Sequence, residues 1–173
     1  LLVKFIDARE DLSIQVHPDD ELARKRHGKS GKCEMWYVLE AEPGASLLTG
    51  FSRPIAPAEY ERRVADNTLT DVLNRQAIAS GDVFYLPAGR VHSIGKGSFI
   101  VEIQQSSDIT YRIYDFDRRD AAGNSRELHT ELAREAIDFE SSENSRITYA
   151  PENNQEVRLV TTPYFTTSLY TLT

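Results

Sequence analysis

Two side chains that can bind a metal ion, Gln15 and His17, lie two positions apart in this sequence. The surrounding segment, residues 12–17, alternates between apolar and polar residues, so both side chains are expected on one face of a β-strand. Glu34 directly precedes another predicted strand, at residues 35–39. A single inward histidine is more often a hydrogen-bonded core residue than a metal ligand, so His17 alone does not establish a site.

A second histidine belongs to a more specific pattern, Gly-x5-Pro-x-Gly-x2-His over residues 81–92. The first glycine turns the chain into a strand, the Pro-x-Gly unit makes a tight corner, and His92 falls on the next strand. Gln15, His17, Glu34 and His92 together offer one amide oxygen, two imidazoles and one carboxylate. Because such a mixed set suits Zn²⁺, Mn²⁺ or Fe²⁺, the sequence predicts one metal site built from these four residues.

Many short segments separated by glycine and proline must hold these residues in place. Strands are expected at residues 1–6, 12–17, 35–39, 83–86, 91–94, 99–104 and 109–114, the first of them buried. Helical segments are expected at 19–28, 54–73 and 126–139, with a linker at 141–155 and further β-structure from 157 to 170. Short strands at this spacing favour a mainly β sandwich or barrel.

Composition narrows the class of protein further. The 173 residues carry 20 basic and 27 acidic side chains, a net charge of −7, which argues against broad nucleic-acid binding. No apolar run approaches the ~20 residues of a membrane span, and no signal peptide is visible. The single cysteine, Cys33, excludes an internal disulfide and a cysteine zinc cage. The expected compartment is the cytoplasm.

Four segments in order carry a resemblance to a known family. The pattern over residues 81–92 matches the second motif of the cupins. The segments that carry the closer resemblance are 15–18 (QVHP), 31–37 (GKCEMWY), 86–92 (LPAGRVH) and 107–112 (SDITYR). With them the chain resembles the short bacterial form of the type I mannose-6-phosphate isomerases, from residue 1 to about 138 and more weakly beyond.

The resemblance implies a cupin (jelly-roll) barrel with an added helical segment, and one zinc ion per chain. It implies an enzyme that interconverts mannose 6-phosphate and fructose 6-phosphate through an enediol(ate). The family's metal ligands fall on Gln15, His17, Glu34 and His92. Its catalytic and substrate-side residues fall on Lys32, Glu102 and Arg112. Cys33 departs from the family pattern, where threonine is expected, and should point away from the site.

The resemblance also suggests how the chain is divided. Residues 1–120 would form the metal-binding barrel without its first part, 121–148 a helical segment, and 149–173 a linker and the start of a second, truncated β domain. Apolar surface should then be left uncovered at both ends. The sequence leaves the oligomeric state open.

Several alternatives stay open at the level of the sequence. Glu102 and Arg112 could form a structural ion pair between strands, because a buried arginine needs a partner. Arg90 or Lys96 could contact a substrate phosphate, whereas His27 and His129 are given no role beyond a helix end or surface. The function could instead be isomerisation of another sugar phosphate, such as glucose 6-phosphate, or sugar binding without catalysis.

Overall fold

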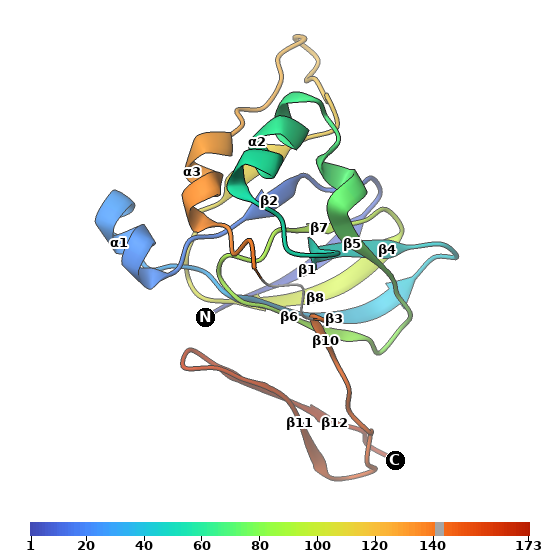
Figure 1. Ribbon diagram of the computed structural model, residues 1–173. Helices are drawn as coiled ribbons and strands as arrows, with labels where there is room; N and C mark the ends of the chain where they lie inside the picture. The colour runs from blue at the N-terminus through green and yellow to red at the C-terminus, as the bar shows by residue number, and fades with distance from the viewer. Residues whose placement is uncertain (141–143) are drawn as a thin grey trace.

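Two antiparallel β-sheets form the body of the protein in the computed structural model, which describes residues 1–140 and 144–173 (Figure 1). The first sheet has the order β1-β8-β3-β6-β10 and the second the order β5-β4-β7-β2-β9. The first contains β1 (Leu2–Ala8), β8 (Ser98–Gln104), β3 (Glu34–Ala41), β6 (Val83–Leu86) and β10 (Arg146–Ile147). The second contains β5 (Leu73–Ala77), β4 (Ser46–Phe51), β7 (His92–Ile94), β2 (Ile14–Val16) and β9 (Tyr111–Tyr114). The predicted mainly β architecture is confirmed.

The space between the sheets is filled by side chains that alternate along the strands. In β8, every second residue from Ser98 to Gln104 is buried, as expected for a strand with one face toward a core. The core between the sheets contains Trp36, Val38, Phe84, Leu86 and Ile100 from the first sheet, and Leu47 and Ile94 from the second. The same alternation turns the side chains of Glu102 and Gln104 inward. Both lie near the end of β8 at which Gln104 pairs with Glu34.

Two of the three helices in the described residues, α2 (Pro57–Ala65) and α3 (Thr130–Ala136), gather on the second sheet at the upper part of Figure 1, whereas α1 (Asp20–His27) lies at the left side of the view. A 3-10 turn spans Leu69–Val72. Tyr60 of α2 and Ala133 of α3 are buried in a shared cluster with Tyr111 and Ile113 of β9. This layer covers the outer face of the strands that carry the site, and α3 is its part within the predicted helical segment 121–148.

Several predicted boundaries were wrong. The expected helix over 54–73 is a short helix and a 3-10 turn that lead into β5, whose sequence LNRQA lacks an apolar alternation. The expected helix over 126–139 occupies only Thr130–Ala136, because Glu127 and His129 before it bond to Arg112 of β9. Strands β4 and β10 were also missed, and residues 141–143 of the predicted linker lie outside the described part of the chain.

A separate hairpin covers part of the outer face of the first sheet (Figure 1). It consists of β11 (Glu156–Thr161) and β12 (Thr166–Tyr170). Its residues Leu159, Val160 and Phe165 pack with Cys33 and Met35. Cys33 therefore points into this outer cluster, as predicted, and burial raises the pKa of its thiol to about 11.

The first strand is not the buried strand that its composition predicts. Its side chains Val3 and Phe5 are 50% and 69% exposed. Large apolar side chains are also exposed at the other end of the chain, at Tyr164, Tyr170 and Leu172. These are the uncovered apolar surfaces expected above; the division into three segments stays a prediction. Among the described residues, no helix is long and apolar enough to cross a membrane.

The loop after β9 is fixed by a buried carboxylate. Asp115, 5% exposed, accepts hydrogen bonds from Arg118 at 2.5 Å and from Arg126 Nε at 2.7 Å. The hydrogen bonds from Arg126, followed by those from Arg118, hold the pKa of Asp115 below its usual value despite burial. The charged form is therefore the one that the folded state favours.

We expect Asp115→Asn to lower the free energy of unfolding at pH 7 by about 1–3 kcal/mol, the size of hydrogen bonds to a charged group. Because the pKa of Asp115 is lowered in the folded state, its stabilisation is complete above the unfolded pKa of ~3.9 and is lost as the pH falls through the folded value. In urea unfolding, the difference in the free energy of unfolding between the variant and the wild type should therefore become smaller below about pH 4. The exposed neighbour Asp117, changed to Asn, is the control; a gap independent of pH would contradict this account.

Candidate metal centre and active site

Three of the four predicted metal ligands meet in the interior. Nε2 of His17 lies 3.1 Å from Oε1 of Glu34, and Nε2 of His92 lies 3.6 Å from Oε2 of the same carboxylate. The ligand atoms of His17, Glu34 and His92 all lie within 4.8 Å of one another, and all three residues are buried. The group is therefore compact enough to hold one metal ion.

The fourth predicted ligand, Gln15, lies beside His92. The two residues are paired across strands β2 and β7, and Nε2 of Gln15 is 3.3 Å from Nε2 of His92. Cross-strand partners share one face of a sheet, so the amide group stands next to the three other ligands. The structure thus brings all four predicted metal residues together.

The outer nitrogens of both histidines are occupied by backbone carbonyls. Nδ1 of His17 is 3.0 Å from the carbonyl of Ile109, and Nδ1 of His92 is 2.8 Å from the carbonyl of Arg90. Donation of Nδ1–H to a carbonyl fixes the tautomer and leaves the Nε2 lone pair facing the centre, an arrangement typical of metal-binding histidines.

Two glycines let the chain carry these ligands. Gly89, in the predicted Pro-x-Gly corner, has a positive φ of 85° and donates its N–H to the carbonyl of His17 at 2.9 Å. This bond ties the corner before His92 to the strand end that carries His17. Gly31 approaches Asp19 so closely that a Cβ would lie 2.3 Å from a backbone carbon, so only glycine fits before Lys32.

The protonation states suit ligation. Burial lowers the pKa of His17 to about 4 and also lowers the pKa of His92, so both rings are neutral near pH 7. Burial acts against ionisation of Glu34, but the neighbouring nitrogens of His17, His92 and Lys32 outweigh it and hold the pKa of this carboxyl well below its usual range. Near pH 7, where both rings are neutral, the positive charge beside the carboxylate is that of Lys32.

Three ligand atoms lack hydrogen-bond partners among the described residues. Nε2 of His17 and both carboxylate oxygens of Glu34 are buried, and their close approaches do not have hydrogen-bonding geometry. Buried polar atoms are normally paired. A cation between these atoms would satisfy all three at once, so the residues present fit a metal ion.

Lys32 stands at the inner edge of an open cleft. Its Nζ lies 2.9 Å from Oε1 of Glu34, and its side chain is buried. The cleft has a volume of about 690 Å³ and is also lined by Lys4 and Lys29, with Ser107 and Asp108. Each of these lysines also pairs with a carboxylate: Lys4 with Glu102, Lys29 with Asp108 and Lys32 with Glu34.

Glu102 is bound on the first sheet and not by Arg112. Its Oε2 accepts a hydrogen bond from Nε1 of Trp36 at 3.0 Å, and its Oε1 lies 2.7 Å from Nζ of Lys4. The Trp36 ring stands edge-on to His92, with 5.4 Å between the ring centroids. The alternative of a structural Glu102–Arg112 pair is therefore wrong: Lys4 compensates the carboxylate, and no ion pair joins it to Arg112 among the described residues.

Arg112 lies on the second sheet, next to the amide ligand. It pairs with Gln15 across β9 and β2, so the two side chains share a face. Nη1 of Arg112 donates to the carbonyl of Glu127 at 2.9 Å, whereas Nε is buried and has no partner among the described residues. Burial, followed by the charge of Arg126, lowers the pKa of Arg112 from its high usual value.

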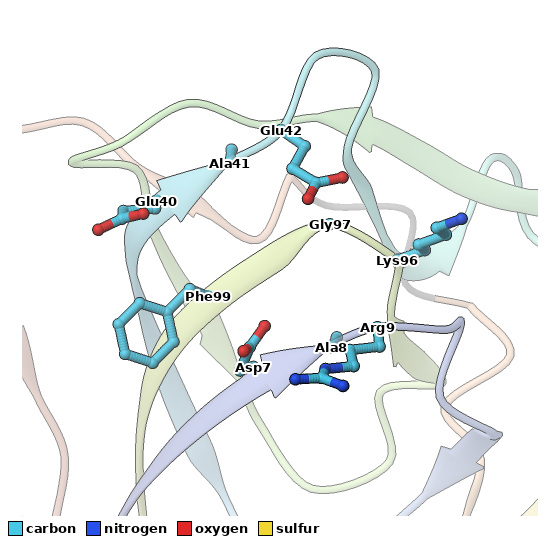
Figure 2. Close-up of a pocket in the computed structure, with 9 residues that line it drawn as sticks. All are labelled: Asp7, Ala8, Arg9, Glu40, Ala41, Glu42, Lys96, Gly97 and Phe99. Carbon is cyan, nitrogen blue, oxygen red and sulfur yellow. The ribbon is translucent and has the colours of Figure 1, made fainter.

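Lys96, which the sequence offers as a possible phosphate contact, lies away from the metal centre. Lys96 lies in a separate pocket of about 290 Å³ with Asp7, Arg9, Glu40 and Glu42 (Figure 2). Glu40 and Gly97 mark the end of β3 and β8 opposite to Glu34 and Gln104. Lys96 is therefore not beside the metal centre.

Two histidines, His27 and His129, make contacts that the sequence does not predict. His27 does not only end a helix, since its Nε2 lies 2.8 Å from the hydroxyl of Tyr111. His129 does not lie on an exposed helix; it precedes α3 and bonds to the backbone of Arg112. Neither contact could be inferred from the sequence, because both join segments far apart along the chain.

Lys4 contacts Glu102 beside the site, although the sequence pattern does not single it out. Its Nζ donates to Glu102 and, at 2.5 Å, to Oε1 of Gln104. The available signal was a lysine in the middle of an apolar alternating strand, a position that usually requires a carboxylate or amide partner.

Comparison with known proteins gives relatives of one kind. No family model matches the chain. The chain is 40% identical over 167 residues to "Mannose-6-phosphate isomerase" of Streptococcus mutans, covering 96% of this chain and 52% of that protein. It is 44% identical over 138 residues to "Probable mannose-6-phosphate isomerase GmuF" of Bacillus subtilis, covering 79% of this chain and 44% of that protein.

A solved structure gives the same result. The crystal structure of the mannose 6-phosphate isomerase from Bacillus subtilis matches with a TM-score of 0.87 and 34% identity, over 95% of this chain and 53% of that one. This match supports the cupin-like fold predicted from the sequence. The chain spans about half the length of the relatives it matches.

We expect one Co²⁺ ion to bind per chain, with visible absorption bands whose intensity reports nitrogen and oxygen ligation. His17→Ala and His92→Ala should each weaken binding by more than ~100-fold, since even residues behind the ligands contribute ~10–100-fold. His27→Ala, which removes an exposed histidine outside the group, should bind as the wild type does. Equal Co²⁺ binding by all four proteins would place the metal elsewhere.

Proposed function

The chain belongs to the mannose-6-phosphate isomerase family, and from this membership we propose that it carries the metal centre of a zinc-dependent aldose–ketose isomerase. The proposed reaction interconverts mannose 6-phosphate and fructose 6-phosphate through an enediol(ate). The observation that carries the proposal is the buried His17–Glu34–His92 group, with ligand atoms that have no hydrogen bonds among the described residues. We further propose that the enzyme acts in the cytoplasm, in keeping with its single, free cysteine.

The identity of the metal follows from the donor set. Two neutral imidazoles, one carboxylate and one amide are nitrogen and oxygen donors without a thiolate, and zinc accepts such a set. The neutral amide of Gln15 is the weakest metal ligand of the four. Gln15 also lies opposite Arg112, which we assign to the substrate, and this supports a position for Gln15 on the substrate side of the centre. We assign one zinc ion per chain to Gln15, His17, Glu34 and His92.

The reaction moves a proton between C1 and C2 of an open-chain sugar phosphate. A bound zinc ion would stabilise negative charge on the adjacent sugar oxygens. Lys32, between Glu34 and the lysine-lined cleft, is placed to hold or move a proton at a sugar oxygen. The cleft lysines could bind an anionic substrate by exchanging a carboxylate partner for it, most readily at the exposed Lys29–Asp108 pair.

Arg112 and Glu102 approach the centre from opposite sheets. Arg112 keeps a buried Nε–H donor that has no partner in the described part of the chain, so it can donate to the enediolate or to the phosphate. Its guanidinium is a poor base because it stays charged at working pH. Glu102 is held by Lys4 and Trp36, and we assign it to the proton-transfer side of the site.

The proposal is tested by supplying mannose 6-phosphate to the zinc-loaded chain and following fructose 6-phosphate. We expect turnover that is lost with EDTA and restored by Zn²⁺, and about one zinc per chain by elemental analysis. Glucose 6-phosphate under the same conditions tests the second sugar phosphate. Tight zinc and sugar-phosphate binding without turnover of either substrate would favour a binding protein and would overturn the proposed function.

We expect Arg112→Ala to lower kcat by about 100- to 1000-fold, the effect of removing a donor that stabilises developing charge. Zinc content and the melting temperature should stay close to those of the wild type. Arg112→Lys should restore little, because lysine lacks the planar fork of donors. Arg119→Ala, in the exposed loop nearby, is the control. Parallel losses of activity and thermal stability would assign Arg112 to the fold instead.

A further inference from the structure

Strand β9 is an edge strand, and Arg112 lies on it with one side open. Within residues 1–140 and 144–173, β9 pairs only with β2, where Arg112 is opposite Gln15. The N–H and C=O of Arg112 both bond away from β2, to residue 129. Arg112 and Gln15 therefore form a non-hydrogen-bonded pair, the kind in which facing side chains approach most closely. The backbone of Arg112 needs partners on its outer side.

His129 supplies both of those partners. Its backbone N–H donates to the carbonyl of Arg112 at 2.7 Å, as a neighbouring strand would. The other bond comes from the ring: the N–H of Arg112 donates to Nδ1 of His129 at 3.2 Å. Two residues earlier, the carbonyl of Glu127 accepts from Nη1 of Arg112 at 2.9 Å. Residues 127–129 thus hold both the backbone and the guanidinium of one residue.

The imidazole is not used to start the helix that follows. His129 precedes α3, and its carbonyl accepts from Ala133 at 2.8 Å, but its side chain makes no capping hydrogen bond. Its Nδ1 must be unprotonated to accept from Arg112, which leaves the proton on Nε2. An apolar side chain at this position could still precede α3, but it would leave the N–H of Arg112 without an acceptor.

We propose that His129 is a positioning residue for Arg112, acting through its Nδ1 acceptor and not through contact with the substrate. It holds β9 in the register that keeps the Arg112 side chain beside Gln15, with the buried Nε–H available to a ligand. The catalytic part of the proposal rests on the proposed function. The structural part, that the ring holds the Arg112 backbone, does not.

Two substitutions separate the acceptor from the rest of the ring. In His129→Asn, Oδ1 takes the place of Nδ1 and can accept from Arg112, whereas His129→Gln places its oxygen one bond further out. His27→Ala is the matched control, because His27 is also an imidazole that contacts β9, through the hydroxyl of Tyr111, but has no contact with Arg112.

Steady-state kinetics with mannose 6-phosphate should show kcat reduced about 10- to 100-fold in His129→Ala and His129→Gln, with KM changed far less, as expected when a catalytic group is misplaced. His129→Asn should recover most of kcat, and His27→Ala should match the wild type. Zinc content should be equal in all five proteins. Equal loss in the Asn, Gln and Ala variants, or a loss no greater than in the His27 control, would overturn the positioning role.

Amide hydrogen exchange at Arg112, measured by NMR, tests the structural part without any turnover. Its exchange should rise at least ~10-fold in His129→Ala and return toward the wild-type rate in His129→Asn. Unchanged exchange in His129→Ala would overturn the proposal. An inactive wild-type chain would instead count against the proposed function, and the exchange measurement would still decide whether His129 holds Arg112.

Discussion

Glu34 carries a carboxylate into a part of the protein from which water is excluded, and its charge must be compensated there. A buried charge without partners is very costly, so the surroundings of this residue are tightly constrained. Lys32 provides one positive charge at 2.9 Å, and the two facing imidazoles are neutral because burial lowers their pKa values. Nε2 of His17 and both oxygens of Glu34 face one another without hydrogen bonds among the described residues, which is the arrangement that a divalent cation would complete.

This constraint explains why two sheets are needed. Glu34 begins β3 in the first sheet, whereas Gln15 and His92 lie on neighbouring strands of the second. The tryptophan of β3 links the two sides, because Trp36 donates to Glu102 on its own sheet and packs edge-on against His92 of the other. A change in the spacing of the sheets would separate the carboxylate from the imidazoles, so the apolar core between them also sets the geometry of the centre.

Much of this centre could be predicted from local patterns. The alternation around Gln15 and His17 and the turn pattern that ends in His92 each fix a side-chain direction over a few residues. What the sequence could not give is contact between distant segments: Lys4 with Glu102, Arg112 with residues 127–129, and the short polar strand β5. The apparent helix over 126–139 failed for the same reason, since pairing with β9 outweighs the helix propensity of residues before 130.

The two sheets also differ in how they end beside the site. In the first sheet, β1 lies at the edge, and its Lys4 reaches inward to compensate Glu102. In the second sheet, β9 lies at the edge, and its open side is covered by residues 127–129 and by α3. Each edge strand therefore contributes one cationic side chain: Lys4 is held by Glu102 and Gln104 of the neighbouring strand, and Arg112 by residues 127–129. An edge strand can move more easily than a central one, so these contacts determine how precisely Lys4 meets Glu102 and how precisely Arg112 lies beside Gln15.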